Sequence, residues 1–341
     1  MITYILMGVI LIAIAVATFM DIHVSQDKDS FMSVSDSAFL RGFWCVIVML
    51  VHVPAAYQNR LQDMVGSFAY IGVTFFFMTS AFGLKYSLKN KPRYMERFWR
   101  RRLPSILIPA VIANAFSVAT DALNGSQISI IDFVNINNWV KVLLLYYFVF
   151  WIIYGILPQR LHTGTWQDVA MCSVVIVFSL VDRLTPFKIT SIWVVEPLGF
   201  AYGIIAANNV DTVKNMMKDN WLIKSGVLMI AAALVGVCYI KYKPIPFVGD
   251  YCIKVILGIS IIAFMFEFIS KLKVGNVANA FLGSISYEVY ILHFGVYSLV
   301  SALFKGRVSS GPYIITSIII TLILAYLLKL ICKPLIRAVK R

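Results

Sequence analysis

An arginine and a histidine separated by ten residues stand in an otherwise apolar run. Arg41 and His52 enclose the segment RGFWCVIVMLVH. Eleven helical residues turn about 20° past three full turns, so both side chains would share one helix face, about 16 Å apart along the axis. A desolvated histidine suits general base catalysis, and an arginine suits phosphate binding. A buried histidine bonded to a neighbouring helix and an arginine anchored at the helix end would explain the two residues equally well.

Pro54 follows the histidine closely. Proline has no N–H to donate to the carbonyl of Leu50, so a helix through this region should bend or open beside His52. Such an opening would make room for a ligand.

Two further blocks carry polar side chains that could take part in chemistry. Ser80 lies among small residues and phenylalanines in GVTFFFMTSAFGL, and Arg101 and Arg102 precede the block LPSILIP. Guanidinium groups bind phosphates well. Close helix packing explains the small residues, and anchoring at a membrane surface explains the arginines.

A late block, SYEVYILH, brings a tyrosine and a histidine together. Ser286 and Tyr290 precede His293 by seven and three residues, so the three share a helix face, whereas Glu288 lies off it. A belt of aromatic residues at a membrane interface would have the same composition.

The chain that must position these residues is strongly apolar. Of its 341 residues, 60% are hydrophobic and 13% are charged. In soluble domains, about 45–50% of the residues are apolar and about 25% are charged. The composition excludes a soluble enzyme, a disordered protein and a nucleic-acid binder, despite a formal net charge of +14. The apolar runs are too long for barrel strands. The predicted fold class is therefore an all-α polytopic membrane protein.

Apolar runs between breakers predict about eleven transmembrane helices. We expect the first to be a retained helix and not a cleaved signal peptide. A signal peptide begins with basic residues, whereas no lysine or arginine precedes this helix. Residues 1–37 would form this extra helix and a short loop, residues 38–332 the main membrane domain, and residues 333–341 a basic tail. The expected spans lie near residues 3–20, 38–57, 68–88, 103–120, 139–157, 167–182, 190–208, 221–240, 251–270, 285–304 and 312–332.

The basic residues outside the spans predict the orientation. The loops on one side and the tail hold 18 lysines and arginines, against 7 on the other side, and residues 85–102 alone hold eight. Cytoplasmic loops carry the excess of basic residues. We therefore expect an external N-terminus and a cytoplasmic C-terminus in the plasma membrane.

With these blocks in order, the sequence resembles the acyltransferase-3 family of multi-spanning membrane O-acyltransferases. The resemblance rests on the Arg-x10-His pair, Arg41 and His52, and on the blocks GVTFFFMTSAFGL, RRLPSILIP and SYEVYILH, with GFAYGII as a weaker match. Thr74, Ala81 and Ser105 depart from it, since an acidic residue, a glycine and a further arginine are common there. The resemblance implies a ten-helix bundle, to which the first helix is an addition.

The resemblance also implies an activity. A family member would transfer an acyl group, acetyl by default, from cytoplasmic acyl-CoA to a hydroxyl of a sugar or other envelope acceptor, such as a polysaccharide or a lipid-linked intermediate. Acyl-CoA would be a co-substrate, with no bound cofactor, no metal and no nucleic-acid partner; membrane lipids would surround the protein. The implied roles are general base for His52, donor binding for Arg41, Arg101 and Arg102, and acceptor or oxyanion binding for Ser80, Tyr290 and His293.

Two alternatives remain open. A transporter or flippase of an envelope intermediate would also need intramembrane charges and broken helices, but such proteins often show inverted repeats, and the sequence shows no repeat. A family member without catalysis, acting as a binding subunit, is favoured by the three departures and disfavoured by the presence of both Arg41 and His52. The sequence does not identify the acceptor or the oligomeric state.

Overall fold

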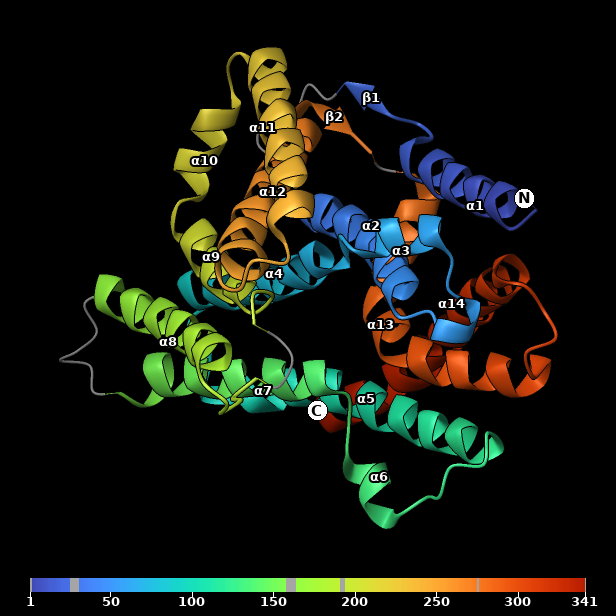
Figure 1. Ribbon diagram of the computed structural model, residues 1–341. Helices are drawn as coiled ribbons and strands as arrows, with labels where there is room; N and C mark the ends of the chain where they lie inside the picture. The colour runs from blue at the N-terminus through green and yellow to red at the C-terminus, as the bar shows by residue number, and fades with distance from the viewer. Residues whose placement is uncertain (1, 25–30, 158–163, 191–193, 275, 341) are drawn as a thin grey trace.

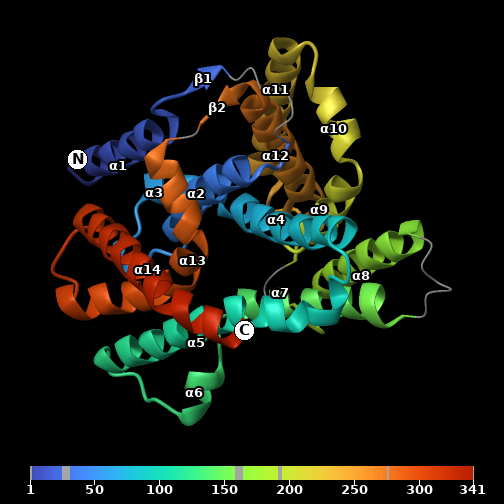
Figure 2. The ribbon, with the colours of Figure 1, turned by 180° about the vertical axis from the view of Figure 1, so that it is seen from behind.

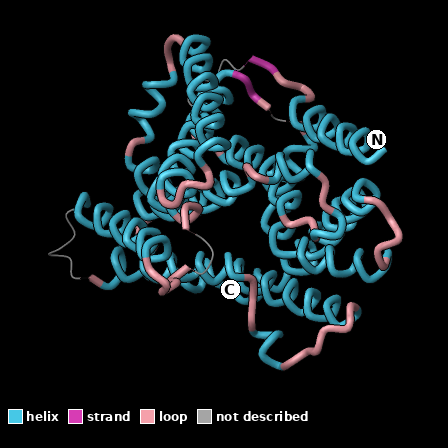
Figure 3. Tube along the Cα trace, viewed as in Figure 1, coloured by secondary structure: helices cyan, strands magenta, loops and turns pink. Residues whose placement is uncertain are grey.

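The computed structural model describes residues 2–24, 31–157, 164–190, 194–274 and 276–340, and most of them are helical (Figure 1, Figure 3). Two short strands, β1 (His23–Val24) and β2 (Leu272–Lys273), pair antiparallel. The α-helices are α1 (Ile2–Phe19), α2 (Val34–Val51), α3 (Arg60–Gly66), α4 (Ala69–Asn90), α5 (Phe98–Leu123), α6 (Ile130–Val134), α7 (Asn138–Trp151), α8 (Gly164–Leu184), α9 (Leu198–Asn208), α10 (Val210–Met217), α11 (Trp221–Tyr242), α12 (Lys254–Lys271), α13 (Val277–Phe304) and α14 (Ser310–Lys340).

Eight helical segments of the described chain are long and apolar enough to cross a membrane. The chain is therefore an all-α, multi-pass membrane protein. The predicted count of eleven is not confirmed, because it includes α1, α8 and α9, which fall outside this group of eight. The helix α9 has only 11 residues, and residues 191–193 of the predicted span 190–208 lie outside the described residues.

The N-terminal helix α1 is fastened to the start of α13. Asn279 donates from Nδ2 to the carbonyl of Thr18 at 2.8 Å, and Asn276 donates to that of Met20 at 2.7 Å. The last carbonyls of a helix have no partner within the helix. The two asparagines therefore satisfy the end of α1 and hold it on the bundle.

Helices α2 and α13 lie side by side in the middle of the molecule (Figure 1, Figure 2). A Cβ added to Gly42 would lie 2.8 Å from the backbone nitrogen of Gly283, so the two helix backbones touch at these glycines. Ten residues after each glycine comes a histidine, His52 on α2 and His293 on α13. Since the two rings also meet, the helices run in the same direction and in matched register.

The contact at Gly283 gives a testable prediction. A Cβ there would overlap the carbonyl of Ala38, a backbone group that cannot rotate away, and overpacking costs about 1–3 kcal/mol. Gly283→Val should lower the melting temperature of the purified protein by separating α13 from α2. Gly226→Val is the matched control, because a Cβ on Gly226 meets nothing within 4 Å. Equal melting temperatures for the two variants would contradict the close packing.

Helices α4 and α9 make the most extensive contact in the bundle. Gly199 and Gly203 are four residues apart, the spacing that lets membrane helices approach closely, and an added Cβ on either would overlap a carbonyl of α4. A Cβ on Gly203 would lie 2.7 Å from the Cβ of Ala81. Because Gly203 has no side chain, there is space for the methyl group of Ala81 between the two helices.

Candidate functional site

Two histidines that are 241 residues apart in sequence meet where α2 ends. His293 Nε2 lies 3.1 Å from His52 Nδ1. His293 is fully buried, whereas His52 is partly exposed. Phe294 packs against both rings, with centroid distances of 4.6 Å to His52 and 4.2 Å to His293. We call His52 and His293 the histidine pair.

Backbone carbonyls determine which nitrogens of the histidine pair carry hydrogen. His52 Nδ1 lies 3.0 Å from the carbonyl oxygen of Val48, and His293 Nδ1 lies 3.2 Å from that of Val289. Because a carbonyl oxygen only accepts, we assign the hydrogen of each neutral ring to Nδ1. The single Nδ1–H of His52 is then shared between the carbonyl of Val48 and Nε2 of His293. Nε2 of His293 then accepts from Nδ1–H of His52, and Nε2 of His52 keeps a free lone pair. This arrangement makes His52 a base held in place by His293.

The backbone around His52 is shaped by Pro54, as the sequence predicts. The predicted span 38–57 is too long, because α2 ends at Val51 and a 3₁₀ turn (Ala55–Tyr57) follows. The carbonyl of Leu50, which Pro54 cannot bond, accepts a hydrogen bond from Nε2 of the fully buried Gln62. The helix therefore opens beside the histidine without leaving an unsatisfied carbonyl.

Aromatic side chains of α13 enclose the histidine pair. The Tyr290 ring lies edge-on to His293 at 5.8 Å, and the Tyr297 hydroxyl donates to the carbonyl of Met49 at 2.6 Å. The structure thus brings Tyr290, His293 and His52 together, and Tyr297 ties α13 to the last turn of α2.

Arg41 lies near the middle of α2, partly buried. Its Nε donates to the carbonyl of Ser37 at 3.2 Å, and its guanidinium interacts electrostatically with Glu288 of α13. The sequence does not predict a role for Glu288, because this residue lies off the helix face of Tyr290 and His293. Its proximity to Arg41 follows from the pairing of two helices that are distant in sequence.

A cavity of about 480 Å³ forms where α5, α7 and the end of α14 meet. The C-terminal end of α14 lies beside α5 and α7 in both ribbon views (Figure 1, Figure 2). Among the described residues that line this space, none is acidic and four are cations. We call it the cationic cavity; its cations are Lys91, Arg101, Arg102 and Lys340.

Hydrogen bonds fix two of these cations. Arg102 donates from Nε and Nη2 to the hydroxyl of the buried Tyr94, at 2.8 and 2.6 Å. Lys340 Nζ donates to Ser105 Oγ at 2.6 Å. Ser105 stands where a further arginine is common in the family that the sequence resembles, so α14 supplies a cation at the position where α5 lacks one. The predicted tail 333–341 continues α14 as a helix through Lys340.

Ser80 lies beside the cationic cavity. Its side chain interacts with the hydroxyl of Tyr147, a residue of α7 that lines the cavity. The sequence groups Ser80 with Tyr290 and His293, whereas the structure joins it to the surroundings of Arg102.

Helix α13 connects the cationic cavity to the histidine pair. The Tyr287 hydroxyl donates at 2.6 Å to the carbonyl of Ile106, which lines the cavity. His293 follows six residues later, about 9 Å along the helix axis. One helix, α13, thus contacts both the wall of the cationic cavity and the histidine pair.

A family model described as an acyltransferase domain, that of acyltransferase family 3, matches residues 36–330. No curated protein and no solved structure matches the chain. The matched segment covers most of the sequence and contains Arg41, His52, Arg102 and His293. The chain therefore belongs to the acyltransferase-3 family of multi-pass membrane proteins.

Proposed function

We propose that the protein is an O-acyltransferase that moves an acyl group, acetyl by default, from cytoplasmic acyl-CoA to a hydroxyl of a sugar or other envelope acceptor. The observation that carries this proposal is the histidine pair, in which His293 Nε2 lies 3.1 Å from His52 Nδ1. With the hydrogen of His52 assigned to Nδ1, its Nε2 is available as a base. Family membership supports acyl transfer. The base, the donor and the acceptor are the proposed part.

His52 would act as general base and then as general acid. Its Nε2 takes the proton of the acceptor hydroxyl while the oxygen attacks the thioester carbonyl. The tetrahedral intermediate collapses as the C–S bond breaks, and His52 returns the proton to the departing CoA sulfur. His293 accepts a hydrogen bond from Nδ1–H throughout, which holds the His52 ring and stabilises its charged form. Tyr290 remains a candidate to bind the acceptor or the oxyanion.

The cationic cavity would bind the phosphates of CoA. Four cations without an acidic neighbour favour a multiply charged anion, and guanidinium groups match phosphate geometry. Arg101 and Arg102 are the predicted donor ligands in the cavity, to which Lys91 and Lys340 are now added. Arg41 remains a proposed donor ligand on α2, beside Glu288. Ser80 would act through Tyr147 at the cavity wall.

The experiment that tests donor binding is thermal stabilisation of the purified protein by CoA and acetyl-CoA. We expect both to raise the melting temperature of the wild type, because they bind the folded state. Phosphate buffer without either compound is the control and should leave the melting temperature unchanged. If neither compound stabilises the wild type, acyl-CoA is not the donor, and a transporter or flippase of an envelope intermediate becomes the favoured function.

Lys340 gives a sharper prediction. Lys340→Ala should weaken acetyl-CoA binding by up to about 1 kcal/mol, or about fivefold, as exposed charge pairs do. The double variant Ser105→Arg, Lys340→Ala should recover the affinity, since the cation then comes from α5. Arg337→Ala is the control from the same exposed helix end. Equal affinities for Lys340→Ala and Arg337→Ala would contradict this role.

A further inference from the structure

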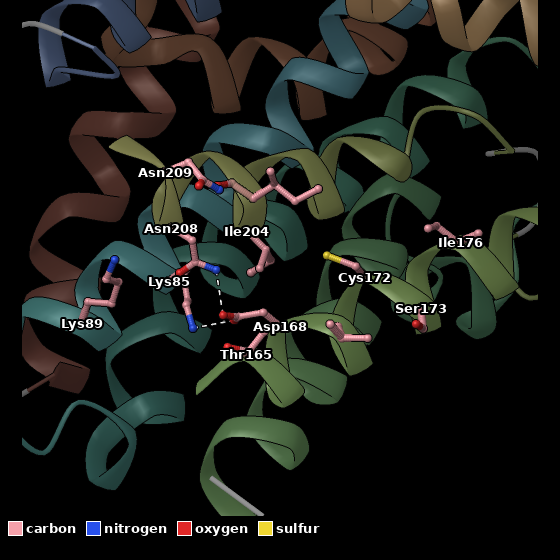
Figure 4. Close-up of a pocket in the computed structure, with 12 residues that line it drawn as sticks. Lys85, Lys89, Thr165, Asp168, Cys172, Ser173, Ile176, Ile204, Asn208 and Asn209 are labelled. Atoms are coloured by element: carbon pink, nitrogen blue, oxygen red, sulfur yellow. Dashed lines mark hydrogen bonds and ion pairs between the residues drawn. The ribbon is translucent and has the colours of Figure 1, made fainter. Parts of the chain in front are cut away.

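A larger open cavity, of about 740 Å³, lies between α4, α8 and α9, apart from the sites described above (Figure 4). One end is polar and the other is aliphatic. The polar end includes Lys85, Lys89, Asp168 and Asn208, and the aliphatic end lies at Ile176; Ile205 lines the wall on α9, three residues before Asn208. We call this space the slot.

A hydrogen-bonded network builds the polar end of the slot. Lys85 Nζ lies 2.5 Å from Asp168 Oδ1, which also accepts from the hydroxyl of Tyr154 at 2.5 Å. Asn208 Nδ2 donates to the other oxygen, Oδ2, at 2.7 Å (Figure 4). Both carboxylate oxygens are thus occupied, and Lys85 is only 6% exposed. The network is neutral and joins α4, α8 and α9 to the π-helical turn Ile152–Ile156, which follows α7 and contains Tyr154.

Lys89 adds a positive charge beside this neutral network. It lies one helical turn after Lys85, is exposed, and makes a long contact of 3.4 Å to the carbonyl of Ala207. Among the ion pairs of the described chain, none involves Lys89. The slot therefore carries one net positive charge at its polar end, which a ligand with one negative charge would balance.

The length of the slot matches one leaflet of a bilayer. Its lining residues on α8 run from Thr165 to Ile176, a rise of about 16 Å. Half of a hydrocarbon core is about 15 Å. Val169, Ile176 and Ile205 are 59%, 45% and 53% exposed, so this wall of the slot is open towards the surrounding hydrocarbon.

We propose that the slot binds one anionic phospholipid of the leaflet on the side of Lys89, predicted to be the cytoplasmic one. The phosphate lies against Lys89 and Asn208, and an acyl chain runs along α8 past Val169 to Ile176. Basic pockets between membrane helices bind anionic head groups in this way. The proposal does not depend on the acyltransferase function, because neither the histidine pair nor the cationic cavity takes part.

Native mass spectrometry of the full-length protein released from mixed micelles tests the proposal. The probes are phosphatidylglycerol, with one net negative charge, and phosphatidylethanolamine, which has a phosphate but no net charge. We expect one retained phosphatidylglycerol per chain, in preference to phosphatidylethanolamine. Lys89→Ala should weaken its retention about fivefold, the effect of one lysine near an anionic lipid. Lys218→Ala, which removes an exposed lysine of the same predicted side outside the slot, should not.

A second variant tests the aliphatic end. Ile176→Trp places a bulky ring where the acyl chain should lie, so it should displace the lipid while Lys89 stays in place. Equal retention by the Lys89→Ala and Lys218→Ala variants would overturn the proposal, as would equal retention of the two lipids by the wild type. Loss of the bound lipid on addition of CoA or of inorganic phosphate would also overturn it, by assigning the slot to a soluble anion.

Discussion

His52→Ala should lower the rate of acyl transfer by about 10²- to 10⁴-fold, the usual contribution of a general base, and leave acetyl-CoA binding unchanged. The reason is the free Nε2 of His52, which faces away from the hydrogen bonds that its Nδ1 makes to Val48 and His293. The measurement is kcat together with the acetyl-CoA dissociation constant. A loss of binding equal to the loss of rate would contradict a role in the chemical step.

His293 should behave as a positioning residue in the same assay. His293→Ala removes the acceptor for Nδ1–H of His52 and should lower kcat less than His52→Ala does. His293→Gln can still offer an accepting oxygen, so it should restore part of the rate. If the Gln variant were no better than the Ala variant at equal thermal stability, the hydrogen bond between the histidines would not orient the base.

Arg102→Ala should weaken acetyl-CoA binding by roughly ten- to hundredfold, as expected for a lost hydrogen bond to a charged group of about 1.5–3 kcal/mol. Tyr94 holds the guanidinium at 2.8 and 2.6 Å, so Arg102 is placed before the donor arrives. We expect KM for acetyl-CoA to rise while kcat changes little. Arg102→Lys should recover only part of the affinity, because lysine lacks the planar fork.

The control for Arg102 is Arg97→Ala. Arg97 is an exposed arginine of the same basic segment that does not line the cationic cavity. Equal effects of the two substitutions would mean that the segment contributes only general positive charge, and the cationic cavity would lose its role.

The class of the fold and the local geometry at His52 could be predicted from the sequence. Composition alone indicates a polytopic helical membrane protein, and Pro54 predicts the opening beside the histidine. The end of the span that the sequence predicts for α2 is too late, because apolar residues continue past Val51. The missing N–H of Pro54 and the side chain of Gln62 determine where the helical hydrogen bonds end.

The pairs that form between distant helices could not be predicted. His52 meets His293 because glycines let α2 and α13 touch, and Lys254 forms an ion pair at 2.8 Å with Glu196, 58 residues away. The sequence of one helix predicts which of its residues share a face, but it does not predict which other helix packs against that face. The contact of Ser80 with Tyr147 at the cationic cavity likewise joins two separate helices.

The three departures from the family pattern have different surroundings. Thr74 and Ala81 are buried where α4 packs against α9, and Gly199 and Gly203 of α9 leave space for them. Ser105 receives Lys340. None of these contacts involves the histidine pair, and the contact at Ser105 brings the cation of Lys340 into the cationic cavity.

The most direct test of the central claim is transfer of radiolabelled acetyl from acetyl-CoA in inside-out membrane vesicles from the native cells. We predict that label enters carbohydrate or lipid-linked envelope material when acetyl-CoA is supplied on the cytoplasmic face. Vesicles that contain equal amounts of folded His52→Ala protein should show no transfer above background. Undiminished transfer by the His52→Ala vesicles would contradict the role of His52 as general base. The absence of label from wild-type vesicles would contradict acetyl transfer by this protein.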